Sequence, residues 1–238
     1  MIIYPALDLR GGKVVRLRQG DPTQQKTYGD DPILIAQRWI AGGAQWLHVV
    51  NLDGAFNQAN DNEQILGRLA QLNIPIQFGG GIRSLEDAAR ALELGVKRVI
   101  LGTSAIQRPE LAAQAVETFG AEAVSVALDS KNGEVVTHGW QQGAGITSVE
   151  AGKRFAALGI RHALFTDISR DGEMRGANLE ATIALARETG LQVIASGGVS
   201  SLAEITQLRQ SGVVAGAILG TALYEGKIDL SQAIHIAE

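Results

Sequence analysis

Residues 74–92, IPIQFGGGIRSLEDAARAL, contain one complete strand–turn–helix unit. Ile74–Phe78 is an apolar run too short for a helix, which favours a buried strand. Three glycines follow, and Ser84-Leu85-Glu86-Asp87 then fits the S/T-x-x-E/D pattern of a capped helix start. The segment therefore predicts a strand, a glycine turn and an amphipathic helix whose apolar stripe is Leu85, Ala88, Ala89 and Leu92.

The same unit recurs along the chain. Short runs rich in Val, Ile and Leu alternate with stretches of helical period. Thr147-Ser148-Val149-Glu150 and Ser201-Leu202-Ala203-Glu204 repeat the capping pattern, and glycines near the expected helix ends fit C-caps. The expected strands are Ile2–Leu7, Trp46–Val50, Ile74–Phe78, Arg98–Leu101, Ala123–Leu128, His162–Thr166, Gln192–Ala195 and Ala215–Leu219.

This alternation predicts a parallel sheet covered by helices. Eight units favour closure into a (β/α)8 TIM barrel, and residues 1–238 are expected to form a single domain of that kind. An open doubly wound sheet is the structural alternative. The composition agrees with either, because 45% hydrophobic but only 5% aromatic residues predict a core of Ala, Val, Ile and Leu.

The chain also resembles itself. Matching segments appear in the same order in both halves at nearly one offset, which chance does not explain. The pairs are Gly80–Leu85 with Gly197–Leu202, Leu101–Thr103 with Leu219–Thr221, Asp53-Gly54 with Asp171-Gly172, and Asp8 with Asp129. We therefore expect a two-fold internal repeat of half-barrels, four strands each.

Charge and composition exclude several kinds of function. A net charge of −4 without a basic tract argues against a nucleic-acid surface. The chain has no cysteine, which excludes disulfides and thiolate chemistry, and its four histidines lack metal-ligand spacing. No signal peptide or membrane span is recognisable in the sequence. A cytoplasmic enzyme for a small molecule, needing neither a metal nor another cofactor, is expected.

Glycine-rich turns predict phosphate binding. Without Cβ atoms the backbone can approach a ligand and aim its N–H groups at it, and a following helix N-terminus favours an anion. Tight turns alone would also explain single motifs, but their pairing after strands three and four and after strands seven and eight favours phosphate. The expected phosphate-binding residues are Gly80, Gly81, Gly102, Thr103, Ser196, Gly197, Gly198, Gly220 and Thr221. Two such cradles on opposite sides of one barrel mouth indicate a substrate with a phosphate at each end.

Three aspartates are candidate acid–base groups. Asp8 and Asp129 each end an expected strand, and Asp171 follows the sixth strand, so all three should face the barrel mouth. Paired carboxylates can divide acid and base roles when their surroundings separate their pKa values. Helix caps or arginine partners are the alternative interpretation, which is favoured for Asp167, whereas Asp53 is interpreted as a turn former.

Other residues are candidates for binding. Arg16, Arg18 and Gln19 follow strand one, and Arg83 follows the first glycine cradle, although each could instead be a solvated surface side chain. Trp140 lies in a glycine-rich loop after strand five, where it could stack on a heterocycle or anchor the loop on the barrel rim. The isolated residues Trp39, Trp46 and His48 are assigned to packing.

These motifs resemble one family. Ala6–Leu9, Gly12–Leu17 and Gln19-Gly20-Asp21 are similar to the phosphoribosyl isomerases of histidine biosynthesis, a (β/α)8-barrel family. Further similar segments are Gln77–Ser84, Thr166–Gly172, Ser196–Val199 and Leu219–Lys227, so the resemblance covers essentially the whole chain. Through these motifs Gly20 and Gly172 join the expected substrate-binding residues.

The resemblance implies an Amadori rearrangement. The substrate would be a phosphoribosyl aminoaldose joined to an imidazole carboxamide ribotide, and the product the ribulosyl aminoketose. Asp8 would act as general base and Asp171 as the favoured general acid, with Asp129 and Thr166 also implicated. The family resemblance also suggests a monomer.

Three alternatives remain. The related cyclase of the same pathway, a lyase fed with ammonia by a glutaminase partner, shares the repeat and the paired aspartates. A bifunctional isomerase would also accept phosphoribosylanthranilate, but such enzymes resemble this chain with Arg where His138 stands. A phosphate-binding barrel without catalysis is the third, and the presence of all three aspartates argues against it.

Overall fold

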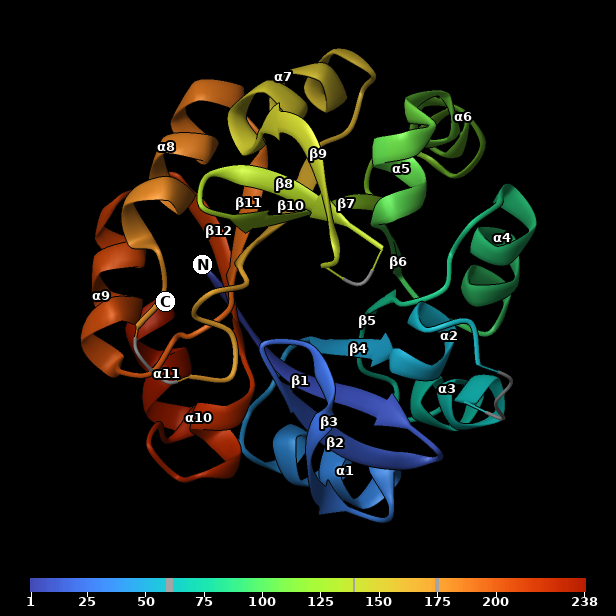
Figure 1. Ribbon diagram of the computed structural model, residues 1–238. Coiled ribbons are helices and arrows are strands. Elements are labelled where there is room, and N and C mark those ends of the chain that lie inside the picture. Colours follow the sequence, from blue (N-terminus) through green and yellow to red (C-terminus); the bar gives the residue numbers. More distant parts are fainter. Residues whose placement is uncertain (59–61, 139, 174–175) are drawn as a thin grey trace.

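Eight parallel strands close into a barrel in the computed structural model, which describes residues 1–58, 62–138, 140–173 and 176–238 (Figure 1). Each strand pairs with the next one around the ring, and the last pairs with the first. The order is β1 (Ile2–Arg10), β4 (Leu47–Asn51), β5 (Ile76–Gly79), β6 (Arg98–Leu101), β7 (Val124–Lys131), β10 (His162–Asp167), β11 (Gln192–Ser196) and β12 (Val214–Leu219). The predicted (β/α)8 barrel is confirmed, and the open sheet is wrong.

Helices surround the barrel (Figure 1). The expected caps form, because Ser84 and Thr147 make capping boxes with Asp87 and Glu150, and the Ser201 hydroxyl accepts from a backbone N–H in the first turn of its helix. The helices are α1 (Pro32–Ala41), α2 (Leu52–Ala55), α3 (Asn62–Ala70), α4 (Leu85–Glu93), α5 (Thr103–Gln107), α6 (Pro109–Phe119), α7 (Ser148–Ala157), α8 (Leu179–Thr189), α9 (Leu202–Gln210), α10 (Thr221–Tyr224) and α11 (Leu230–Ala237). None of the helices formed by the described residues has the length and apolar character that a membrane span requires.

Two antiparallel hairpins extend the barrel, where the sequence analysis expected loops. β1 runs on into β2 (Lys13–Arg18) and β3 (Asp21–Gly29), and β7 into β8 (Glu134–Thr137) and β9 (Gln142–Thr147). Both begin with a two-residue turn at positive φ, Gly11-Gly12 and Asn132-Gly133, which is the chemistry of a tight hairpin. Because β1 and β7 are the first and fifth barrel strands, the two half-barrels carry matching extensions.

The core has two layers. Buried aliphatic side chains fill the space between the strands and the helices, and a smaller set fills the barrel interior. The interior set is Tyr4, Ala6, Ile100, Leu164, Ile194 and Ile218. Trp39 packs in the outer layer and Trp46 against the Tyr4 ring, so both have the packing roles that were expected. The filled interior leaves the carboxyl ends of the strands as the place where a cavity can form.

Candidate active site

A cavity of about 690 Å³ opens at the carboxyl ends of the barrel strands, and all eight strands contribute to its wall. Its floor is apolar, with Ile100, Leu164 and Ile218 from the barrel interior. The predicted site residues that line it are Asp8, Arg16, Gly20, Gly80, Gly81, Arg83, Gly102, Thr103, Asp129, Trp140, Thr166, Asp171, Gly172, Ser196, Gly197, Gly198, Gly220 and Thr221.

Two binding candidates, Arg18 and Gln19, lie outside the cavity wall, and Arg18 pairs with Glu173 instead. The Gln19 side chain donates to the carbonyl of Ser169 over 3.2 Å, and its backbone N–H donates to Asp171 O over 3.3 Å. Gln19 therefore joins the segment after β1 to the segment after β10. A substrate-binding role for its side chain has no support in this arrangement.

Asp8 and Arg16 form a largely buried pair. They lie on the adjacent antiparallel strands β1 and β2, and Arg16 Nη1 is 2.5 Å from Asp8 Oδ2. Arg16 Nη2 also donates to the carbonyl of Ala6 over 2.8 Å. Burial raises the pKa of Asp8, and the Arg16 guanidinium opposes that rise by favouring the carboxylate.

Asp129 is held by Trp140 from the turn between β8 and β9. The indole N–H donates to Asp129 Oδ2 over 2.8 Å, and Thr166 stands beside Asp129 in the β7–β10 register. Burial raises the pKa of Asp129, whereas hydrogen bonds from Trp140 and Thr166 oppose the rise. Trp140 thus lines the cavity and anchors its own hairpin, whereas its stacking on a heterocycle stays a prediction.

Asp171 is the third buried carboxyl of the cavity, and its pKa is strongly raised. Burial raises its pKa to about 7, the charges of Asp8 and Asp129 add to the rise, and Arg16 opposes it. A carboxyl of this kind keeps its proton up to about neutral pH, whereas the guanidinium in direct contact with Asp8 favours the carboxylate form of that residue. The three predicted aspartates therefore share one cavity and differ in their charge environment.

The glycine motifs form two matching walls. Gly80 and Gly81 after β5, and Gly197 and Gly198 after β11, all have φ between +78° and +94°. A Cβ on Gly80 would lie 2.2 Å from the carbonyl oxygen of Asn51, so only glycine fits there. In the closed strand order β5 and β6 lie opposite β11 and β12, which places the two glycine motifs on opposite sides of the cavity.

The helix starts beside these glycines are open. Gly102 and Gly220 are the N-cap residues of α5 and α10, and neither helix has a side-chain cap. The first N–H groups of both helices therefore lack the hydrogen bond that a Ser, Thr or Asp cap would supply. Arg83 lines the same wall, donating to the carbonyls of Gly54 and Gly81 over 2.8 and 3.3 Å.

Three segments meet over the cavity. A Cβ on Gly20 would lie 2.5 Å from the Trp140 ring, so the turn after β2 packs directly on the indole. A Cβ on Gly172 would lie 3.0 Å from the carbonyl of Leu17. Arg18 and Glu173 add an ion pair of 2.6 Å between the same two segments. The cavity is thus partly roofed by chain that follows β1, β7 and β10.

His48 is the residue that sequence reasoning missed. It was assigned to packing, but it lines the cavity on β4, and its Nδ1 accepts from Gln77 Nε2 over 3.1 Å, with the ring proton then on Nε2. Burial lowers the pKa of His48 to about 3, with Arg16 adding to the effect, so the ring is neutral. The signal was present, because alternate residues of a barrel strand face inward and His48 stands beside inward-facing Ala6 of β1.

Asp53 and Asp167 have structural surroundings. Asp53 accepts from Gly11 N over 2.7 Å and from Asn62 Nδ2 over 2.9 Å, and it does not line the cavity. Asp167 accepts from Asn178 Nδ2 over 2.8 Å. Both fit the turn and partner roles expected for them. Among the described residues, no three His, Asp or Glu side chains are grouped as a metal site would require.

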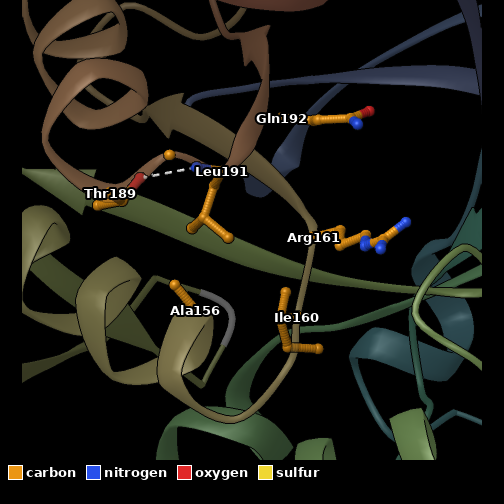
Figure 2. Close-up of a pocket in the computed structure, with 7 residues that line it drawn as sticks. Ala156, Ile160, Arg161, Thr189, Leu191 and Gln192 are labelled. Atoms are coloured by element: carbon orange, nitrogen blue, oxygen red, sulfur yellow. Dashed lines mark hydrogen bonds between the residues drawn. The ribbon is translucent and has the colours of Figure 1, made fainter.

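A second, smaller pocket of about 340 Å³ lies away from this chemistry (Figure 2). It is formed where α7 leads into β10 and α8 into β11, at the amino ends of the strands, and Thr189 Oγ1 accepts from Leu191 N beside it. Its wall includes none of the predicted site residues. In barrels the chemistry belongs to the opposite face.

Comparison with known proteins agrees with this arrangement. Residues 2–229 match a family model described as "Histidine biosynthesis protein". Similar curated proteins come from Moorella thermoacetica (45% identical, covering 100% of this chain and 98% of the relative), Roseiflexus sp. (46%; 98% and 98%) and Pelotomaculum thermopropionicum (48%; 100% and 92%). Each is named 1-(5-phosphoribosyl)-5-((5-phosphoribosylamino)methylideneamino) imidazole-4-carboxamide isomerase.

Proposed function

We propose a function from the premise that this chain belongs to the histidine biosynthesis protein family. It is an isomerase that converts the phosphoribosylamino aldose named in its relatives into the corresponding ketose, an Amadori rearrangement. The observation that carries the proposal is the convergence of Asp8, Asp129 and Asp171 on one cavity, where each carboxyl has different charged and hydrogen-bonding partners.

Asp171 serves as the general acid. It gives its proton to the ring oxygen of the aminoaldose, the C1′–O bond breaks, and the nitrogen lone pair forms an iminium with C1′. A pKa of about 7 suits this step, because about half of the Asp171 carboxyls still carry their proton at pH 7 and the acid is not too weak to release it.

Asp8 serves as the general base. It takes the proton from C2′, the electron pair of that bond forms the enolamine, and tautomerisation gives the ketose. The substrate nitrogen is the electron sink, so the chain's own part is to hold and move protons, and neither a metal nor another cofactor is proposed. Asp129 and Thr166, adjacent across β7 and β10, line the same side of the cavity and hold the reacting sugar.

The two glycine walls support a substrate with two phosphates. One phosphate would lie against Gly80, Gly81, Gly102 and Thr103, and the other against Ser196, Gly197, Gly198, Gly220 and Thr221. Backbone N–H groups at the open starts of α5 and α10 supply the donors. Trp140 closes over the imidazole between them.

The proposal also covers the domain organisation, the partners and the choice of substrate. We propose a single barrel domain over residues 1–238, acting as a cytoplasmic monomer on a small molecule, without a nucleic-acid partner. His138 stands at the cavity wall with its backbone N–H on Thr103 Oγ1 over 2.9 Å and its Nε2 3.0 Å from Gln107 Nε2. Because enzymes that accept phosphoribosylanthranilate resemble this chain with Arg at this position, His138 favours the imidazole carboxamide substrate over the anthranilate carboxylate.

The test is an assay of the purified chain with the aminoaldose, alongside Asp8→Asn and Asp171→Asn. Each variant should lose roughly a hundredfold or more in kcat/KM. Phosphoribosylanthranilate, offered in parallel, should not be turned over. If the unmutated chain binds the aminoaldose without converting it, the isomerase proposal fails, and a binding barrel or a cyclase takes its place.

A further inference from the structure

Tyr224 touches the Asp8–Arg16 pair from outside the cavity wall. It ends α10, directly after β12, and its hydroxyl donates to the carbonyl of Ala6 over 2.8 Å. The same carbonyl accepts from Arg16 Nη2 over 2.8 Å. One backbone oxygen on β1, two residues before Asp8, therefore fixes both the tyrosine and the guanidinium.

The Tyr224 ring lies against the guanidinium as well. The Arg16 Cζ is 5.5 Å from the ring centroid, within the range of a cation–π contact. Two further rings hold Tyr224 from other sides, Trp39 edge-on at 5.3 Å and Tyr28 at 4.7 Å between centroids. A ring packed in this way is a rigid surface for a long and flexible arginine side chain.

Arg16 has few other restraints. Its Nε is buried and has no hydrogen-bond partner among the described residues. Gly220 leaves the space for it, since a Cβ there would lie 2.8 Å from Arg16 Cζ. The guanidinium is thus held by Asp8, by the Ala6 carbonyl and by the Tyr224 ring.

We propose that Tyr224 is a positioning residue, which holds the Arg16 guanidinium against Asp8 and so fixes the orientation and the charge of the base. The inference rests on the proposed function, in which Asp8 removes the C2′ proton. Tyr224 does not line the cavity and acts through Arg16, so its loss should change the behaviour of Asp8 more than the binding of substrate.

Several charged or titratable groups lie around Asp8 or line the cavity with it, and each comes from a different part of the chain. Arg16 belongs to β2, His48 to β4, Asp129 to β7, Asp171 to the segment after β10, and Tyr224 to α10. Among the described groups that face Asp8, the guanidinium is the fixed cation, because His48 is neutral. If the Arg16 guanidinium moves away, the pKa of Asp8 rises further, because the attraction that opposes the effect of burial on this pKa weakens.

The decisive experiment follows Asp8 directly. The carboxyl carbon of Asp8 is observed by NMR of ¹³C-aspartate-labelled protein, with Asp8→Asn used to assign the signal, in the unmutated chain, Tyr224→Phe and Tyr224→Met. Tyr224→Met removes the aromatic face, and the midpoint of the Asp8 titration in this variant should move to higher pH by about one unit or more. Tyr224→Phe keeps the ring but loses its anchor on Ala6, and its midpoint should move the same way by less.

The matched control is Tyr4→Met. Tyr4 is a buried tyrosine of the barrel interior and contacts Trp46 rather than Arg16, so the packing loss is similar. In Tyr4→Met the midpoint of the Asp8 titration should not change. In the isomerase assay, Tyr224→Met should lose roughly tenfold or more in kcat with KM within about twofold, which is the pattern of a lost transition-state interaction.

Two outcomes overturn the inference. An Asp8 midpoint that stays in place in both Tyr224 variants shows that the tyrosine is structural only, and if Tyr224→Met does not fold, Tyr224→Phe alone decides. A shift of equal size in Tyr4→Met shows a general effect of packing. Because the NMR titration needs no turnover, a chain that fails to isomerise removes the proposed function without touching the Tyr224–Arg16–Asp8 relationship.

Discussion

Gly102 and Gly220 adopt nearly the same backbone conformation, φ −100° and ψ −115° at the first and φ −109° and ψ −107° at the second. They stand 118 positions apart in the sequence, each between a barrel strand and a short helix. The half-barrel repeat is therefore expressed in backbone geometry as well as in sequence. Their neighbours differ, however, because only Gly220 lies against the Arg16 side chain.

That difference predicts unequal effects of alanine at the two positions. In Gly220→Ala the new Cβ would lie 2.8 Å from Arg16 Cζ, so the guanidinium must move. Its hydrogen bond to Asp8 is then weakened. In Gly102→Ala the nearest atom, Ala127 Cβ, is 4.0 Å away. We expect Gly220→Ala to lower kcat by roughly tenfold or more, and Gly102→Ala to change mainly KM. Steady-state kinetics on both variants check this, and equal kcat values would contradict it.

The pH dependence of turnover should show Asp171. Because the acid must carry its proton and burial raises the pKa of Asp171 to about 7, kcat/KM should fall as the pH rises through that region. The residual activity of Asp171→Asn should lack this basic limb. The profile is measured between pH 5 and 9 with saturating and limiting aminoaldose. A basic limb that persists unchanged in Asp171→Asn would assign the acid to another group, with Asp129 next in line.

The buried carboxyl of Asp171 should lower the free energy of unfolding at neutral and higher pH. Its pKa in the folded protein lies above the ordinary value of 3.8, so the folded state binds the proton more tightly than the unfolded state. Stability linked to Asp171 is therefore full below about pH 4 and is lost as the pH rises toward 7. Asp171→Asn removes this cost and should raise the free energy of unfolding at pH 8 by roughly 1–4 kcal/mol.

Urea unfolding at pH 4.5 and pH 8 measures that difference. The gain from Asp171→Asn should be larger at pH 8, while activity falls. Asp53→Asn is the matched control, because Asp53 is the repeat counterpart of Asp171 but accepts hydrogen bonds from Gly11 and Asn62. It should lose stability rather than gain it. A gain from Asp171→Asn that is the same at both pH values would argue against the shifted carboxyl.

The first glycine wall should tolerate no side chain. Gly80 has φ +94°, and a Cβ there would lie 2.2 Å from the carbonyl oxygen of Asn51. Gly120 has a similar φ of +85° but nothing within 4 Å of its Cβ position. Gly120→Ala should therefore cost about 1 kcal/mol of unfolding free energy, from backbone conformation alone, and Gly80→Ala clearly more. Chemical denaturation of both variants tests this, and equal losses would show that the wall can relax.

The local sequence pattern was sufficient to predict most strands and helix starts of the barrel. All eight expected strands are present within a few residues of their predicted bounds, and the helices after Ser84, Thr147 and Ser201 begin as predicted. These features depend on neighbours in sequence, namely apolar runs, hydroxyl caps and glycine turns. The hairpins were missed, although Gly11-Gly12 and Asn132-Gly133 are hairpin turns, because their strands are polar or only partly apolar.

The sequence by itself determined the strand–helix alternation, the two-fold repeat and most of the residues that face the barrel mouth, because each follows from spacing along the chain. Only the tertiary structure decided how those residues are paired. It turned Gln19 toward Ser169, brought His48 into the cavity wall and set Arg16 between Asp8 and Tyr224. The pKa of Asp171 also belongs to this level, because desolvation and the charges of Asp8 and Asp129 exist only once strands far apart in sequence enclose one cavity.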